Sequence, residues 1–544
     1  MLTRRRTLAA AALTVAVVVG ALLARGAQVA GQGEPSVTID GATLQGDARE
    51  VSPRPAVGLL LPPGSTASDF RAVIDGRSLR VRAATGRTAQ LEVGELPQGS
   101  RHRLEVWRES LGPAHVGAVQ ITFQVTDPLQ VAASWLVGRA QTSVRVTASR
   151  ELADPGPIEQ ALTRAGASVR RDERGIEGRW SPGGAAAFTI SAGLRATTGA
   201  YLPTSFRAVL GDVPAGPFSR VDLSQPISSD TTGLKLRAYF VGGPLARADL
   251  ARHGRQVSVF TPSFYAAAGD GRLVPDIDDH ALATARSMGL QVEPLLTNQD
   301  FSANSARQLF ASVAASQGLA SALVIEAQKR GYAGYQLDFE GLGYGDRDQL
   351  TRFSQRLSER LAAAGLKYST AVIPQKQSNG SGLAQLFSHS GVYDFAALSH
   401  NASSTSLMAY DQHTSSTEPG PVAGLDWVQQ VATASSLGLD RSRIFLGVPL
   451  YYRDWPLRGT PTAGGYGDAI AAAVAGNGSI SWDFAAQSPL VQYGAPGEEH
   501  VTWLEDLTSL AAKAQVAKRM GFSGIAAWRL GLEDPAFWDL WPAR

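Results

Sequence analysis

The chain has 544 residues, of which 44% are hydrophobic and 18% are charged, and its formal net charge is +2. This length predicts two to four folded domains, and the near-neutral charge gives no indication of a nucleic-acid partner. Because the sequence contains no cysteine, it excludes disulfides, thiol nucleophiles and cysteine-ligated metals.

Residues 1–30 have the pattern of an export signal. Arginines at positions 4–6 precede an apolar run over residues 8–24, which is the order of regions in a signal peptide. No clean small-residue cleavage site follows, so the segment is either a signal peptide or an uncleaved anchor in the cytoplasmic membrane. In both cases we expect the rest of the protein to be secreted or to lie in the cell envelope.

Short alternating segments then predict two small all-β modules. The first spans 36–126 and includes "FRAVIDGRSLRVRA", in which two strand patterns flank an Asp-Gly turn. The second spans 127–212 and has strand patterns on both sides of the short helical segment "PIEQALTRAG". Their rhythm resembles that of bacterial immunoglobulin-like sandwiches. We expect these modules to act as spacers or, alternatively, to bind glycans directly.

A linker rich in Pro, Ser and Asp over 213–232 precedes the last domain, 233–544. The strands predicted there are 234–242, 256–262, 291–298, 334–340, 367–374, 404–411, 443–449 and 524–528. Eight apolar strands alternating with helices over about 310 residues predict an α/β fold, the (β/α)8 TIM barrel. The long stretch 454–500, between the seventh and eighth strands, predicts an inserted subdomain.

The fourth strand, "GYQLDFE", ends in two carboxylates. With the period of two of a strand, Gln336, Asp338 and Glu340 share one face, and in a barrel this strand end lies at the mouth of the site. Two close carboxylates resist joint ionisation, so Glu340 is a candidate general acid held protonated partly by Asp338. A solvated strand end or a structural ion pair would give the same short pattern.

Four ordered blocks extend this pattern: "YAGYQLDFE", "LMAYDQH", "RIFLGVPLYYRDW" and "GFSGIAAWRLGLEDP". Together they resemble glycoside hydrolase family 18, a chitinase-like family. "PSFYAAAGDGRLV" and "VEPLLTN" at the second and third strands are similar to the bacterial spore-cortex and cell-wall N-acetylglucosaminidases of that family. The resemblance spans roughly 234–541 and implies the TIM-barrel fold as well.

The resemblance implies roles for three catalytic residues. Glu340 matches the acid/base that protonates the glycosidic oxygen. Asp338 matches the carboxylate that orients the 2-acetamido group of the substrate, and Tyr410 matches the tyrosine that hydrogen-bonds the acetamido carbonyl. In this family the acetamido oxygen itself attacks the anomeric carbon, so catalysis is substrate-assisted and retains the anomeric configuration.

The resemblance also implies residues that bind the sugar. Trp528 matches the tryptophan beneath the sugar ring, with Met408 and Asp411 beside Tyr410. Further candidates are Tyr265, Asn298 and Gln375 at the ends of strands two, three and five, and Arg453 after strand seven. Core, loop or ion-pair roles are alternatives for each of these.

Two positions depart from the family pattern. Ala333 and Gln336 stand where its first and middle acidic residues would be. The middle aspartate of the family shares the proton of the residue at the position of Asp338. We expect Gln336 only to hydrogen-bond Asp338, which would change the protonation cycle and the rate.

The sequence gives no indication of a cofactor. Its eight histidines show no H-x-H or HExxH spacing, and no phosphate-binding glycine motif occurs. We therefore predict an exported, monomeric glycoside hydrolase, without metal or cofactor, that cleaves β-1,4 bonds next to N-acetylglucosamine in peptidoglycan or a chitin-like polymer. The alternative is a non-catalytic glycan-binding protein that uses the barrel groove without turnover.

Overall fold

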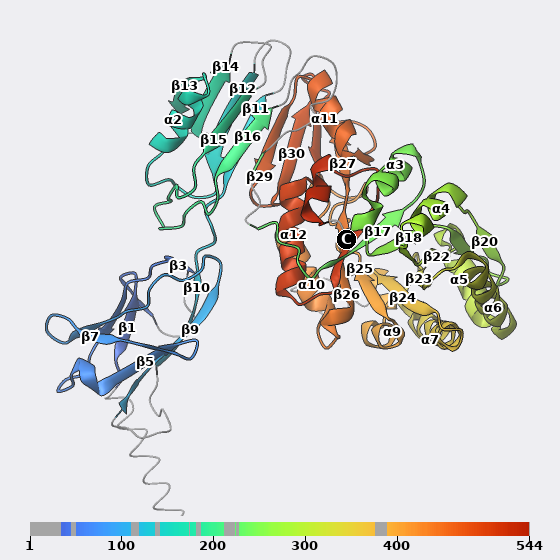
Figure 1. The fold of residues 1–544 in the computed structure, drawn as a ribbon, viewed down its shortest axis with the longest axis horizontal. Coiled ribbons are helices and arrows are strands. Elements are labelled where there is room, and N and C mark those ends of the chain that lie inside the picture. Colours follow the sequence, from blue (N-terminus) through green and yellow to red (C-terminus); the bar gives the residue numbers. More distant parts are fainter. Residues whose placement is uncertain are drawn as a thin grey trace, which may run out of the picture. The chain divides into compact units, whose positions relative to one another are not determined.

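A computed structural model of the chain describes residues 34–44, 50–109, 119–136, 142–172, 175–180, 186–210, 223–224, 228–375 and 389–542 (Figure 1). Contacts divide the chain into two compact units. The first contains residues 1–130, 148–157 and 190–205, and the second contains 131–147, 158–189 and 206–544. The predicted export signal and most of the predicted linker lie outside the described residues.

The first unit contains two five-stranded sheets. One has the order β2-β1-β4-β8-β7, with β1 (Ser36–Ile39), β2 (Ala42–Leu44), β4 (Val57–Leu60), β7 (Val81–Ala83) and β8 (Thr88–Leu91). The other has the order β3-β10-β9-β5-β6, with β3 (Glu50–Val51), β5 (Phe70–Ile74), β6 (Arg77–Leu79), β9 (Arg101–Arg108) and β10 (Val119–Val125). Alternate residues of both sheets, such as Leu59 and Phe123, are buried in one shared core. This part is therefore two-layered, and its immunoglobulin-like character stays a prediction.

The predicted Asp-Gly turn joins β5 to β6. Asp75 and Gly76 both have positive φ, at 48° and 80°, as a tight hairpin turn with two left-handed residues requires.

The segment predicted as a second separate sandwich has a different arrangement. Its strands β11 (Val131–Leu136), β12 (Thr142–Ala148), β13 (Ser168–Asp172) and β14 (Gly175–Trp180) belong to a nine-stranded sheet of order β13-β14-β12-β11-β29-β30-β31-β27-β28. Helix α2 (Gly156–Arg164) connects β12 to β13, and β15 (Ala186–Ile190) pairs with β16 (Phe206–Leu210). The joining pairs are Trp135 with Ile480 and Leu136 with Ser479. An unpaired strand edge accepts another strand through its backbone alone, so the side-chain pattern did not indicate this partner.

The eight predicted strands of the last domain form a closed parallel barrel. They are β17 (Lys235–Phe240), β18 with β19 (Val259–Pro262, Tyr265–Ala267), β21 with β22 (Gln291–Val292, Leu295–Asn298), β23 (Gly334–Asp338), β24 (Lys367–Val372), β25 (Ser404–Leu407), β26 (Ile444–Pro449) and β32 (Gly524–Trp528). Strand β32 pairs in parallel with both β26 and β17 and so closes the ring. The carboxyl ends of all these strands therefore meet at one mouth.

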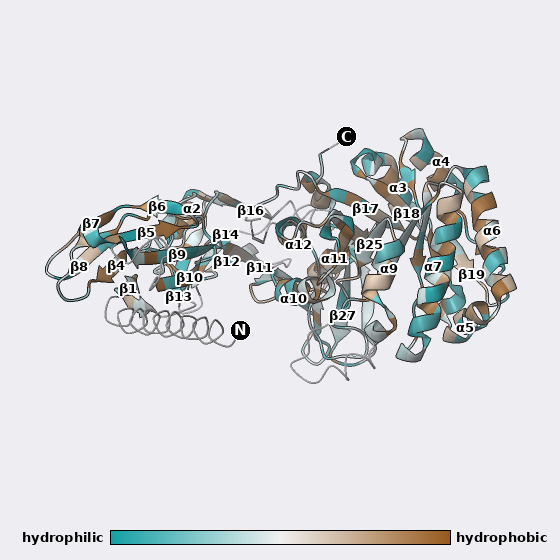
Figure 2. Ribbon diagram, turned by 90° about the horizontal axis from the view of Figure 1, so that it is seen from below, coloured by the Kyte–Doolittle hydropathy of each residue, from teal (hydrophilic) through white to brown (hydrophobic). Residues whose placement is uncertain are grey.

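Helices cover the outside of the barrel (Figure 1). They are α3 (Pro244–His253), α4 (Asp279–Ser287), α5 (Ala303–Ala311), α6 (Val313–Arg330), α7 (Arg347–Ala363), α9 (Phe395–Asn401), α10 (Leu425–Ser435) and α12 (Leu507–Arg519). Helix α7 buries Leu350, Phe353, Leu357 and Leu361 at helical spacing, and Figure 2 shows hydrophilic residues on the same helix. Among the described residues no single helix has the length and apolar character of a membrane span, and only α5 and α6 together, across a 101° bend, meet these criteria.

A subdomain is inserted between the seventh and eighth barrel strands, as the sequence predicts. It comprises β27 (Tyr451–Pro456), β28 (Thr462–Gly465), α11 (Tyr466–Ala475), β29 (Ser479–Asp483), β30 (Ser488–Tyr493) and β31 (His500–Trp503). Its five strands form the second half of the nine-stranded sheet.

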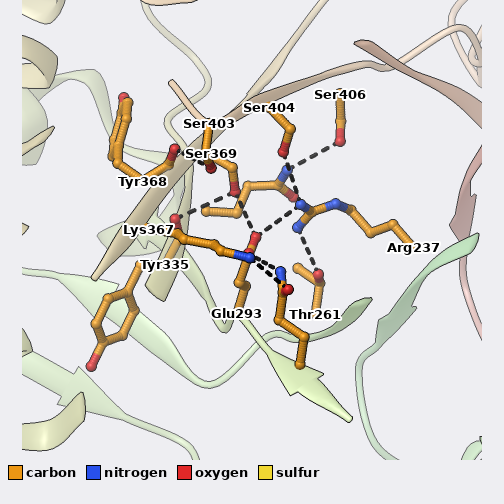
Figure 3. Close-up of polar contacts among 12 residues, drawn as sticks. Arg237, Thr261, Glu293, Tyr335, Lys367, Tyr368, Ser369, Ser403, Ser404 and Ser406 are labelled. Carbon is orange, nitrogen blue, oxygen red and sulfur yellow. Dashed lines mark hydrogen bonds and ion pairs between the residues drawn. The ribbon is translucent and has the colours of Figure 1, made fainter. Parts of the chain in front are cut away.

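An ion pair fills the barrel interior near the amino-terminal ends of the strands. The guanidinium of Arg237 lies 2.8 Å from the carboxylate of Glu293, and each side chain is only 1% exposed. Arg237 also donates to the hydroxyls of Thr261 and Ser404, and Ser369 donates to Glu293 (Figure 3). The two terminal nitrogens of the guanidinium are thus bonded, whereas Arg237 Nε is buried without a hydrogen-bond partner among the described residues. The buried pair is therefore compensated in part.

We expect Glu293→Ala to lower the free energy of unfolding of the barrel by about 3–5 kcal/mol, because it leaves the Arg237 charge buried without its partner. Urea unfolding followed by tryptophan fluorescence measures this change. The control is Arg272→Ala, because the pair of Arg272 with Asp270 is exposed and is worth about 0–1 kcal/mol. An equally small loss in both variants would contradict the prediction.

Candidate active site

Asp338 and Glu340 lie at the barrel mouth, where β23 ends. Asp338 is 5% exposed, and its Oδ1 has no hydrogen-bond partner among the described residues. Burial, together with the charge of Glu340, raises the pKa of Asp338 well above its usual value. Burial, together with the charge of Asp411, raises the pKa of the half-buried Glu340. The two carboxyls therefore keep a proton to higher pH than free carboxyls do.

Asn298, at the end of β22, fixes the backbone of Glu340. The Glu340 N–H donates to Asn298 Oδ1, and Asn298 Nδ2 donates to the Glu340 carbonyl, both at 2.9 Å. Asn298 Nδ2 also donates to the carbonyl of Ser302, and the side chain is fully buried. Asn298 was predicted as a sugar contact, but the structure makes it a positioning residue for the candidate acid.

The chain turns sharply directly after Glu340. Gly341 has a φ of +73°, and a Cβ at this position would overlap the carbonyl oxygen of Phe301. Only glycine fits this close approach without strain. The Glu340 side chain is thereby held at the point where the strand leaves the sheet.

Gln336 lies in the layer below Asp338 and has other partners than predicted. Tyr239 donates its hydroxyl to Gln336 Oε1 at 2.8 Å, and Gln336 Nε2 donates to Ser406 Oγ at 3.1 Å. Neither of these bonds goes to Asp338. The predicted hydrogen bond from Gln336 to Asp338 is therefore replaced by a neutral layer of hydrogen bonds between the strands.

Tyr410 follows β25 and is placed beside the carboxylates. Its ring lies 6.4 Å from that of Tyr451, at 78°, and a Cβ on Gly447 would approach the Tyr410 ring to 3.0 Å. Burial and the nearby Tyr239 and Asp338 raise the pKa of Tyr410. Tyr410 therefore keeps its phenolic proton and can donate a hydrogen bond at neutral pH.

Met408 and Asp411 flank Tyr410, as predicted. Met408 is buried, whereas Asp411 has a left-handed backbone with a φ of 59°. Asp411 Oδ1 accepts hydrogen bonds from the Tyr451 hydroxyl at 2.5 Å and from Arg453 Nη2 at 2.6 Å. Arg453 thus holds Asp411 and connects the loop after β25 to the inserted subdomain.

Trp528 ends β32 and faces the barrel interior. Its ring meets that of Tyr239 at 5.2 Å and 61°, and it packs against a buried cluster of Tyr239, Leu295, Phe445 and Ala526. The Trp528–Arg529 peptide bond is cis. This placement fits the predicted floor beneath a bound sugar.

Tyr265 lies outside this site, and its prediction as a sugar contact is corrected. Its hydroxyl donates to Glu326 Oε2 at 3.1 Å and lies 3.0 Å from the Tyr332 hydroxyl. Glu326 belongs to α6, so Tyr265 lies between the barrel wall and that helix. The strand that carries it is broken between Pro262 and Tyr265, and this break changes which residues face inward.

Sequence reasoning missed Tyr239 and Tyr451. Tyr239 contacts both Gln336 and Trp528, and its period-two relation to Arg237 on the first strand was a signal that it faces inward. Tyr451 holds Asp411. Within the described parts of the chain, no group of three or more His, Asp or Glu side chains could hold a metal ion.

Comparisons with known proteins identify what this barrel is similar to. Residues 292–533 match the family model of glycosyl hydrolases family 18. The chain is 29% identical over 294 residues to YdhD of Bacillus subtilis, and the matched region covers 52% of this chain and 67% of that protein. It is 27% identical over 286 residues to a cortical fragment-lytic enzyme of Bacillus anthracis, and the matched region covers 51% of this chain and 65% of that enzyme. The crystal structure of a chitinase from Chromobacterium violaceum matches with a TM-score of 0.52 and 26% identity, over 56% of this chain and 97% of that chain.

We expect Asp338→Asn to stabilise the protein more at pH 8 than at pH 4. The pKa of Asp338 is raised by folding, so the folded chain binds a proton that the unfolded chain releases, and stability is lost as pH rises from about 4 through the folded pKa. Asparagine removes this loss, which amounts to about 1.4 kcal/mol for each pKa unit. Thermal unfolding at the two pH values, with the exposed Asp270→Asn as control, measures the difference. An equal effect of Asp338→Asn at both pH values would contradict it.

Proposed function

We propose that the barrel of this chain, whose residues 292–533 match the model of glycosyl hydrolases family 18, cleaves β-1,4 bonds next to N-acetylglucosamine in peptidoglycan or a chitin-like polymer. The family match supports glycoside hydrolysis, and we propose the retaining, substrate-assisted mechanism for it. The observation that carries the proposal is the pair of buried Asp338 and half-buried Glu340 at the end of β23, with raised pKa values on both carboxyls.

The proposed acid is Glu340. Its raised pKa keeps it protonated toward neutral pH, where it can transfer the proton to the glycosidic oxygen as the bond breaks. Because Asn298 holds the backbone of Glu340 on both its N–H and its carbonyl, the acid is presented in a fixed position. Water could later return its proton to the same carboxylate during the second half of the reaction.

The proposed partner of the substrate's acetamido group is Asp338. Its Oδ1 has no partner within the described chain and can accept the acetamido N–H. Tyr410 would donate to the acetamido carbonyl and so direct the oxygen toward the anomeric carbon. Trp528 would support the sugar ring from below. No enzyme nucleophile is needed in such a reaction, because the acetamido oxygen attacks the anomeric carbon.

Two polymers remain as candidate substrates. The name of the cortical fragment-lytic enzyme supports a spore-cortex or cell-wall glycan, and the chitinase supports chitin. The alternative function is glycan binding without catalysis. The raised pKa of Glu340 favours hydrolysis over this alternative.

We expect Glu340→Gln to lower kcat by about 100- to 10,000-fold on N-acetylchitooligosaccharides, because the amide cannot donate a proton to a sugar leaving group. The loss on a nitrophenyl N-acetylglucosaminide should be smaller, since nitrophenolate leaves without protonation. Product release from both substrates measures this difference.

The matched control for this experiment is Tyr265→Phe, which lies outside the site and should keep its KM and kcat. Equal activity of Glu340→Gln and the wild type would refute the assignment of the acid. If the wild type bound the sugar and released nothing, the binding function would be correct.

We also infer that the protein acts outside the cytoplasmic membrane. The support is the sequence of residues 1–30, in which arginines precede an apolar run. Fractionation of cells that produce the chain with and without these residues tests the inference, and a cytoplasmic location of both forms would contradict it.

A further inference from the structure

A second cavity lies on the inserted subdomain. Its volume is about 820 Å³, within the range of about 300–1,000 Å³ that is typical of ligand sites. It is lined by strand ends of the nine-stranded sheet and by Ser415, Thr417 and Pro419 of the loop that follows Asp411. The reaction proposed above does not use these residues.

One row of side chains runs across the sheet along this cavity. Trp455 pairs with Val501, Val501 with Gln492, Gln492 with Ser479, and Ser479 with Leu136. Residues directly opposite each other on neighbouring strands share one face of the sheet, and all five of these line the cavity. The row therefore forms one continuous wall across β27, β31, β30, β29 and β11.

This wall begins beside the active site. Arg453 precedes Trp455 by two positions on β27, so it lies on the same face, and it holds Asp411 next to Tyr410. From Arg453 to Pro456, which ends β27 and lines the cavity, the strand advances about 10 Å. This separation is within the reach of a short branch of a substrate bound at the catalytic mouth.

The chemistry of the cavity suits a peptide. Leu136 and Leu457 are 51% and 62% exposed, and they offer apolar surface. Trp455 Nε1 is buried and has no hydrogen-bond partner within the described residues. Gln492 also lines the cavity and adds an amide that can pair with peptide groups.

The charge of the cavity adds a preference. Among the described residues that line it, Glu499 is the only Asp, Glu, Lys or Arg, and the lining His500 is bonded to Asp454. Hydrogen bonds from the backbone lower the pKa of Glu499, so it is ionised at neutral pH. A carboxylate at the rim favours a ligand with an ammonium group and disfavours an anion.

We propose that this cavity binds the short peptide that peptidoglycan carries on every second sugar, with its ammonium-bearing side chain toward Glu499. The inference rests on the proposed hydrolase activity and commits that activity to peptide-bearing glycan strands. Chitin has no such branch and would leave the cavity empty. It also assigns a function to Leu136, because this residue of the segment before the barrel supplies the last position of the wall.

The test measures the activity of the full-length protein on three substrates: peptidoglycan strands with their peptides, the same strands stripped of peptide by an amidase, and chitin oligosaccharides. We expect kcat/KM to be highest on the peptide-bearing strands. Glu499→Gln should lower kcat/KM on these strands roughly two- to fivefold, the size of an exposed ion pair, and should leave the stripped strands unchanged. Glu498→Gln is the matched control, because Glu498 is exposed and does not line the cavity.

A second variant, Ser479→Arg, places a bulky cation in the middle of the row. It should lower kcat/KM on peptide-bearing strands more than Glu499→Gln does and again leave stripped strands unchanged. Equal wild-type rates on the two strand preparations, or equal losses on both in the variants, would overturn the proposal.

The proposed activity and the cavity can fail separately. If no glycan is cleaved, the hydrolase proposal fails, and calorimetry of Glu340→Gln with the amidase-released peptides still reports on the cavity. Binding that is weakened by Glu499→Gln supports the cavity assignment in that case, and no measurable binding overturns it.

Discussion

The site depends on one constraint: buried Asp338 and half-buried Glu340 lie close together, where burial and neighbouring carboxylates disfavour their ionised forms. Asp338 and Glu340 each have a raised pKa, and Asp338 Oδ1 has no hydrogen-bond partner in the described chain. The surrounding structure fixes the backbone that carries them. Asn298 holds Glu340, and Tyr393 donates its hydroxyl to the carbonyl of Phe339 between them. The backbone is thus held so that the charges cannot separate to relieve their repulsion.

The interior of the barrel contains three polar layers, which differ in whether they carry charge and in how that charge is compensated. At the amino-terminal end, Glu293 is neutralised by Arg237. In the middle, Tyr239, Gln336 and Ser406 form neutral hydrogen bonds. At the carboxyl-terminal end the carboxyls have no counter-ion, and Asp338 Oδ1 has no partner among the described residues.

This layering explains the departure at position 336. An aspartate in the middle layer would be a third acidic group between the ion pair and the catalytic pair, and it would share protons with Asp338. Gln336 is bonded to Tyr239 and Ser406 instead, so it cannot take up a proton from Asp338. In this chain the charge of Glu340, together with burial, raises the pKa of Asp338, and no carboxyl at position 336 takes part.

The sequence was sufficient for the parts of the structure that follow from local patterns. The alternation of apolar and polar residues and the positions of the strand ends can be read from the sequence. They were enough to predict the eight barrel strands and to place Asp338, Glu340 and Tyr410 close together. Tyr265 was misplaced because a break in its strand changes the face on which it lies. Asn298 was misread because its role depends on two backbone atoms of Glu340, which no side-chain pattern records.

The largest difference concerns strand β11, and its reason is general. Within the sheet, the strands of the insertion end at β29, and a strand at the edge of a sheet presents unpaired backbone groups that require a cover. Strand β11 provides this cover through the pairs of Trp135 and Leu136, more than 300 positions before their partners in the sequence. A domain boundary drawn at residue 233, where the barrel pattern begins, would remove β11 and expose that edge. The segment before the barrel is consequently part of the sheet that borders the active site, and any selection of substrate by this wall depends on residues that the barrel alone does not contain.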